Sequence, residues 1–78
     1  MSTWANIHEW YFNDEDLKLT QAVVDKGLWE DCEDEIRNST NITSVHSDVI
    51  ATTRVMSEDD WNDDVNIAIK IILKYAKK

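Results

Sequence analysis

The sequence has very little of several residue types on which small functional scaffolds depend. It contains one cysteine, one glycine and no proline among 78 residues. The single Cys32 excludes a disulfide framework within one chain, and a single glycine excludes a glycine-rich phosphate-binding loop. Cys32, His8 and His46 are too few and too widely spaced for the usual zinc patterns. We therefore expect neither a metal site nor a cofactor site.

Long apolar segments are also absent. The longest one spans residues 67–76, is interrupted by Lys70 and Lys74, and falls short of the about 20 residues that a membrane helix needs. Residues 1–6 lead directly into polar positions and do not resemble a signal peptide. The sequence therefore predicts a cytoplasmic protein that has no membrane partner.

The residues that are present suffice for one small core. Hydrophobic residues make up 42% of the chain and include four tryptophans, which is too apolar a composition for a disordered acidic tail. No linker or low-complexity run divides the chain, so we interpret residues 1–78 as a single domain. A chain of this size buries only about 60% of the surface that its unfolded form exposes. Because this limits stability, we expect a homodimer.

Two helix starts follow the same design. Asn13 and Ser57 are suitable N-cap residues, and each is followed by three acidic residues that suit the first turn of a helix. Gly27, the only glycine, stands where a left-handed residue would end the first helix. Apolar residues recur at helical spacing after each start and again after Gly27. The pattern predicts helices over residues 14–26, 28–38 and 58–77.

The predicted last helix is apolar around most of its circumference. Ile67, Ile71 and Leu73 lie outside its main apolar stripe, so the helix has more than one face to bury. We expect it to pack against its own domain and also against another element or a second chain. The main stripe consists of Trp61, Val65, Ala68, Ile69, Ile72, Tyr75 and Ala76.

The segments 39–55 and 4–12 fit both a strand and a helix. Thr, Val and Ile are dense in the first segment and favour strands over residues 42–45 and 49–55, joined by a turn at 46–48. The same apolar residues also fit one face of a helix. We favour the hairpin, and so predict an α+β domain with two or three helices and a short antiparallel hairpin or sheet. An all-α bundle is the alternative.

No combination of residues points to catalysis. Cys32 lies among five acidic residues that stabilise the neutral thiol, so we interpret it as a core residue on the inner face of the second helix. Residues 60–64 match the opening of a calcium loop, but Val65 replaces the required Gly and Ile71 replaces the required Glu. We therefore do not expect an enzyme.

The charge distribution argues against direct binding of nucleic acid. The formal net charge is -8, and residues 1–64 contain all 16 acidic residues but only four of the eight basic ones. Affinity for nucleic acid comes largely from Lys and Arg side chains that neutralise phosphates. A helix-turn-helix reading of residues 28–56 would therefore place an acidic body against a duplex, and we do not favour it.

The acidic residues fall mainly into three clusters, at residues 14–16, 30–35 and 58–64. Acids in a first turn stabilise their helix by about 0.3–1 kcal/mol each, which accounts for residues 14–16 and 58–60. The other acids bring no such benefit, and like charges four residues apart on a helix repel each other. A requirement for solubility is one explanation of these other acids. The more specific explanation is that they bind a basic partner. The candidate partner-binding residues are Glu30, Asp31, Glu33, Asp34, Glu35, Asp63 and Asp64.

The spacing of these carboxylates suggests what the partner is. Carboxylates three or four residues apart on a helix lie about 5–6 Å apart, a separation comparable with that of neighbouring phosphates on a nucleic-acid strand. In size, acidity and lack of a catalytic signature, the chain resembles the small DNA-mimic inhibitors that phages and mobile elements direct against host proteins. This resemblance implies a basic nucleic-acid-binding protein as the partner. The alternative is an antitoxin-like or immunity-like module that binds a protein through Trp4 and Trp10, because Trp is enriched at binding hot spots.

Overall fold

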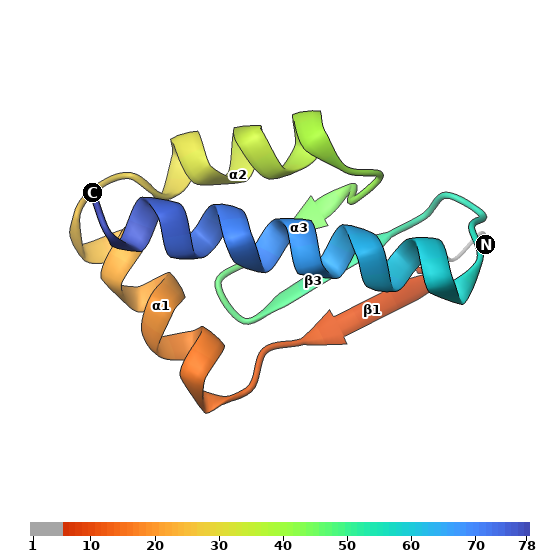
Figure 1. Ribbon diagram of the computed structural model, residues 1–78, viewed down its shortest axis with the longest axis horizontal. Coiled ribbons are helices and arrows are strands. Elements are labelled where there is room, and N and C mark those ends of the chain that lie inside the picture. Colours follow the sequence, from red (N-terminus) through yellow and green to blue (C-terminus); the bar gives the residue numbers. More distant parts are fainter. Residues whose placement is uncertain (1–5) are drawn as a thin grey trace, which may run out of the picture.

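The computed structural model describes residues 6–78, which form an α+β domain (Figure 1). Within this range, three helices accompany an antiparallel sheet of three strands. This confirms the predicted fold class and excludes the all-α alternative. In chain order the elements are β1 (His8–Tyr11), α1 (Asp14–Asp25), α2 (Trp29–Ser39), β2 (Ser44–Val45), β3 (Val49–Thr52) and α3 (Glu58–Ala76).

The sheet has the order β1-β3-β2, with β3 in the centre. β2 and β3 form the predicted hairpin, which is closed by a hydrogen bond of 2.9 Å from His46 N–H to Val49 O. β3 ends at Thr52, three residues earlier than predicted. The Thr52 hydroxyl donates to Asn41 O at 2.7 Å and accepts from Arg54 N–H at 3.1 Å, and these bonds turn the chain out of the sheet. Residues 4–12 were the second ambiguous segment, and their described part contains the strand β1 rather than a helix.

The three helices begin and end within one residue of the predicted positions. Asn13 Oδ1 accepts a hydrogen bond of 2.8 Å from Asp16 N–H, and Ser57 Oγ accepts one of 3.1 Å from Asp60 N–H, so both act as N-caps. Gly27 has φ +71°, a left-handed conformation that residues with a side chain rarely adopt. The local sequence signals therefore set the helix boundaries.

The core lies around α3, which packs against α1 and α2 (Figure 1). Two elements flank α3, so its buried face is wider than the predicted stripe, and Ile71, expected outside the stripe, is buried as well. The ring of Trp61 stacks on His8 of β1, with 5.5 Å between the ring centroids. His8 Nε2 also lies 3.0 Å from Met56 O, so the sheet edge and the start of α3 are joined through this histidine.

Among the helices of residues 6–78, none combines the length and the apolar character that crossing a membrane requires.

Candidate acidic binding surface

The single cysteine lies on the inner face of α2. Cys32 and Ile36 both have exposed fractions of 0% and pack in the core, as the sequence predicted for Cys32. Burial, followed by the negative charges of Glu35 and Glu33, raises the pKa of the Cys32 thiol to about 11. The thiol is therefore neutral and inaccessible at ordinary pH, which excludes it as a nucleophile.

The rest of the α2 surface carries the exposed Glu30, Asp31 and Asp34 and the half-buried Glu33, and we name these four residues the α2 acidic face. Arg37 Nη2 lies 3.4 Å from Glu33 Oε2, and Arg37 Nη1 lies 3.8 Å from Asp34 Oδ1. Ion pairs in residues 6–78 involve only three of the sixteen carboxylates of the chain: Glu33, Asp34 and Glu35. Most of the negative charge is therefore not neutralised within the protein.

Two of the predicted partner-binding acids lie at the start of α2. The helix begins at Trp29, so Glu30 and Asp31 lie in its first turn, and Leu28 at the N-cap makes no side-chain capping bond. First-turn acids stabilise a helix through its dipole. Glu30 and Asp31 therefore stabilise α2, contrary to the expectation that no acid of residues 30–35 does so. Asp34 lies beyond the first turn and is exposed, so it has no such role.

Glu35 is half-buried and contacts α3. Its carboxylate forms an ion pair with Lys74 and accepts a hydrogen bond of 2.7 Å from the Tyr75 hydroxyl. The bond from Lys74, and then that from Tyr75, hold the pKa of Glu35 below its ordinary value. The same contact raises the pKa of Tyr75 to about 12. Glu35 therefore fixes the middle of α2 to the C-terminal half of α3.

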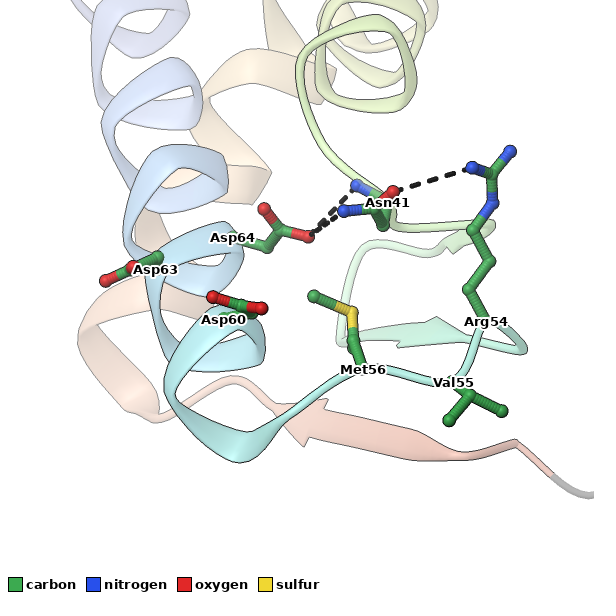
Figure 2. Close-up of a pocket in the computed structure, with 7 residues that line it drawn as sticks. All are labelled: Asn41, Arg54, Val55, Met56, Asp60, Asp63 and Asp64. Carbon is green, nitrogen blue, oxygen red and sulfur yellow. Dashed lines mark hydrogen bonds between the residues drawn. The ribbon is translucent and has the colours of Figure 1, made fainter.

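Asp64 is also an internal contact, with an exposed fraction of 8%. Its Oδ2 accepts hydrogen bonds from Asn41 N–H at 3.0 Å and from Asn41 Nδ2 at 3.3 Å (Figure 2). Asn41 follows the C-terminal end of α2, so this contact fixes that end to the N-terminal half of α3. The sequence indicated this burial. Position 64 lies three residues after Trp61 and four before Ala68, so it falls on the apolar stripe of the helix.

A cavity of about 550 Å³ lies beside this contact. Figure 2 shows the Arg54 guanidinium reaching Asn41 Oδ1, at 3.5 Å, while the Asp63 carboxylate points away from both residues. Three carboxylates and one guanidinium contribute to the lining, so the cavity carries an excess of negative charge. Its lining residues are Asn41, Arg54, Val55, Met56, Asp60, Asp63 and Asp64.

The seven predicted residues therefore do not form one cluster. Five of them lie on α2. Asp63 and Asp64 lie on α3, near the C-terminal end of α2. In the described part of the chain, no group of three or more His, Cys, Asp and Glu side chains is arranged to hold a metal ion. The chemistry that this surface offers is the electrostatic attraction of exposed carboxylates for a basic partner.

Comparisons with known proteins add no relative: no protein-family model, curated protein or solved structure matches this chain.

The buried contact of Asp64 gives a direct prediction about stability. Asp64→Ala removes a carboxylate that accepts two hydrogen bonds, and bonds of this kind contribute about 2 kcal/mol. We expect the free energy of unfolding, measured by urea denaturation with far-UV circular dichroism, to fall by about that amount. The matched control is Asp63→Ala, because Asp63 is exposed on the same helix and should change stability by less than about 0.5 kcal/mol. Equal losses in both variants would contradict the structural role of Asp64.

Proposed function

We propose that this protein is a small, non-enzymatic binding protein of the cytoplasm that blocks a basic nucleic-acid-binding protein by occupying its nucleic-acid site. The observation that carries the proposal is the α2 acidic face, on which the exposed Glu30 and Asp31 have no ion-pair partner in the described residues. This is the charge pattern that a cationic groove attracts. The protein would act in the manner of the DNA-mimic inhibitors of phages and mobile elements.

Rigidity supports this proposal. Glu35 attaches α2 to Lys74 and Tyr75, and Asp64 attaches the chain after α2 at Asn41. Because both contacts are made to the single helix α3, they hold α2 in place, and the carboxylates of the α2 acidic face, which precede Glu35 on that helix, keep a fixed spacing before any partner binds. A preorganised charge array loses less conformational entropy on binding than a flexible acidic segment. These contacts therefore favour a rigid competitor over an acidic tail.

The cavity beside Asp64 extends the acidic surface at the far end of α2. Its three carboxylates outnumber the single Arg54, and it is open to solvent beside the first turns of α3. A Lys or Arg side chain of the partner would find acceptors there. In this proposal, Asp63 and Asp60 contribute to binding, whereas Asp64 and Glu35 hold the two helices in place.

The experiment that tests the proposal is affinity capture from a nuclease-treated bacterial lysate, with stepwise elution by salt and identification by mass spectrometry. We expect a basic nucleic-acid-binding protein that elutes as salt rises, because attraction between exposed charges is screened. Duplex DNA should displace the captured protein, and the purified pair should show inhibition of DNA binding. A partner that resists salt and ignores DNA would overturn the proposal.

One observation favours the alternative, an antitoxin-like or immunity-like module. Trp10 and Tyr11 on β1 have exposed fractions of 38% and 70%, so an exposed aromatic side chain is available on each face of this strand. Trp4, the other predicted anchor, lies outside the described residues. A salt-resistant partner that is lost on Trp10→Ala would support this alternative.

A further inference from the structure

The two edges of the sheet are very different. One edge is β2, which has only two residues, and a short edge strand offers little to pair with. The other edge is β1, which lies outermost in Figure 1 and has four residues. Proteins commonly protect such an edge with Lys or Pro, and His8–Tyr11 contains neither. Instead, the edge carries the exposed aromatic side chains of Trp10 and Tyr11.

The hydrogen bonds inside the sheet show which backbone groups of β1 have no partner among residues 6–78. Phe12 N–H donates to Asp48 O at 3.0 Å, in line with the register in which Trp10 lies opposite Ile50. Backbone polar groups in an antiparallel strand alternate between its two sides. The groups of His8 and Trp10 are therefore directed toward β3, and those of Glu9 and Tyr11 are directed toward the free edge.

We propose that β1 pairs antiparallel with β1 of a second copy of this chain, around a two-fold axis at Trp10. Glu9 of each copy then lies opposite Tyr11 of the other, and these two residues exchange N–H to O=C bonds in both symmetry-related places. The two three-stranded sheets become one continuous sheet, and the exposed β1 edges disappear. A closed two-fold contact of this kind is the commonest form of homo-oligomer.

The choice of register follows from charge and from the number of bonds. A two-fold axis at Glu9 would place two carboxylates directly opposite each other, which destabilises a strand pair. An axis at Tyr11 would move Glu9 opposite Asn13, which is already the N-cap of α1 and has left the strand. The axis at Trp10 avoids both problems and uses all the outward backbone groups of Glu9 and Tyr11.

The side chains complement each other in the same register. The Tyr11 hydroxyl already donates to Glu9 Oε2 at 2.7 Å within one chain, so the two residues form a donor and acceptor pair. Across the dimer, Tyr11 faces the same carboxylate of the second copy. The two Trp10 side chains meet at the axis, and aromatic cross-strand pairs stabilise antiparallel strands. This interface lies on β1, whereas the α2 acidic face lies on another element, so the two proposals are tested separately.

Cross-linking tests the register directly. Trp10→Cys places two thiols at the axis, where opposed Cα atoms of such a pair are about 4.5 Å apart, within the range of a disulfide. The native Cys32 is buried and does not compete. We expect rapid formation of a covalent dimer under mild oxidation. The control is Val55→Cys, because Val55 is 90% exposed but lies outside the strands. Equal or slower cross-linking of Trp10→Cys would overturn the register.

A second variant keeps the test valid if Trp10→Cys weakens the fold. Tyr11→Glu puts a carboxylate opposite Glu9 of the other copy in both places, so sedimentation velocity should show a loss of dimer. The matched variant Val55→Glu adds the same charge at an exposed residue outside the strands and should remain dimeric. Adding Glu9→Lys to Tyr11→Glu restores opposite charges and should restore the dimer. A wild-type monomer at all concentrations, or a Tyr11→Glu dimer of wild-type affinity, would overturn the proposal.

Discussion

Reversing three charges on the α2 acidic face, with Glu30→Lys, Asp31→Lys and Asp34→Lys, is expected to weaken binding of the basic partner on the order of 100-fold or more. Like charges brought together in an interface cost several kcal/mol, and each 1.4 kcal/mol corresponds to about tenfold in affinity. Each substitution changes the charge by two, so the net charge moves from -8 to -2. The measurement is isothermal titration of the partner identified by capture, at two salt concentrations.

The variant should remain folded because two effects oppose each other. Lysines at positions 30 and 31 lose the favourable interaction with the helix dipole, about 0.3–1 kcal/mol each. Asp31→Lys turns the repulsion between residues 31 and 35, four positions apart, into an attraction, whereas residues 30 and 34 still carry like charges, now both positive. Far-UV circular dichroism and thermal melting check this expectation.

A matched control separates position from total charge. Reversing three exposed acids elsewhere gives the same net charge of -2, and one of them lies in a first turn, as Glu30 does. We expect the control to keep most of the affinity, because long-range attraction between exposed charges is screened by salt. If both triple variants lose affinity equally, binding depends on net charge alone and the assignment to α2 is wrong. The control substitutions are Glu15→Lys, Asp25→Lys and Asp48→Lys.

Local sequence signals predicted most of the fold. The N-caps Asn13 and Ser57 and the left-handed Gly27 act through hydrogen bonds and torsion angles of neighbouring residues. Such features depend on residues within a few positions of each other, so they are readable without a structure. The density of β-branched residues likewise indicated the hairpin, although the side chain of Thr52 ends β3 earlier than this density suggested.

The candidate site was less predictable because its decisive contacts are long-range. Glu35 meets Tyr75 at a separation of 40 residues, and Asp64 meets Asn41 at a separation of 23. Neither pairing is visible in a sequence pattern, so both acids were grouped with residues expected to face a partner. For Asp64 the apolar stripe gave a usable warning of burial. For Glu35 the nearby sequence offers Arg37 as the only cation, whereas the cation that it actually pairs with, Lys74, comes from α3.

Replacing Trp61 by Ala is expected to lower the free energy of unfolding by about 3–5 kcal/mol, the largest effect of any single substitution considered for this chain. Trp61 is buried, stacks on His8 and belongs to the core cluster, so its loss opens a cavity and releases β1 from the start of α3. Native domains have total stabilities of about 5–15 kcal/mol, so this loss is a large fraction of the total. Urea denaturation measures the change. Leu73→Ala, on an exposed part of the same helix, should cost less than about 1 kcal/mol. A similarly small loss for Trp61→Ala would mean that the contact between α3 and β1 is not a main source of stability.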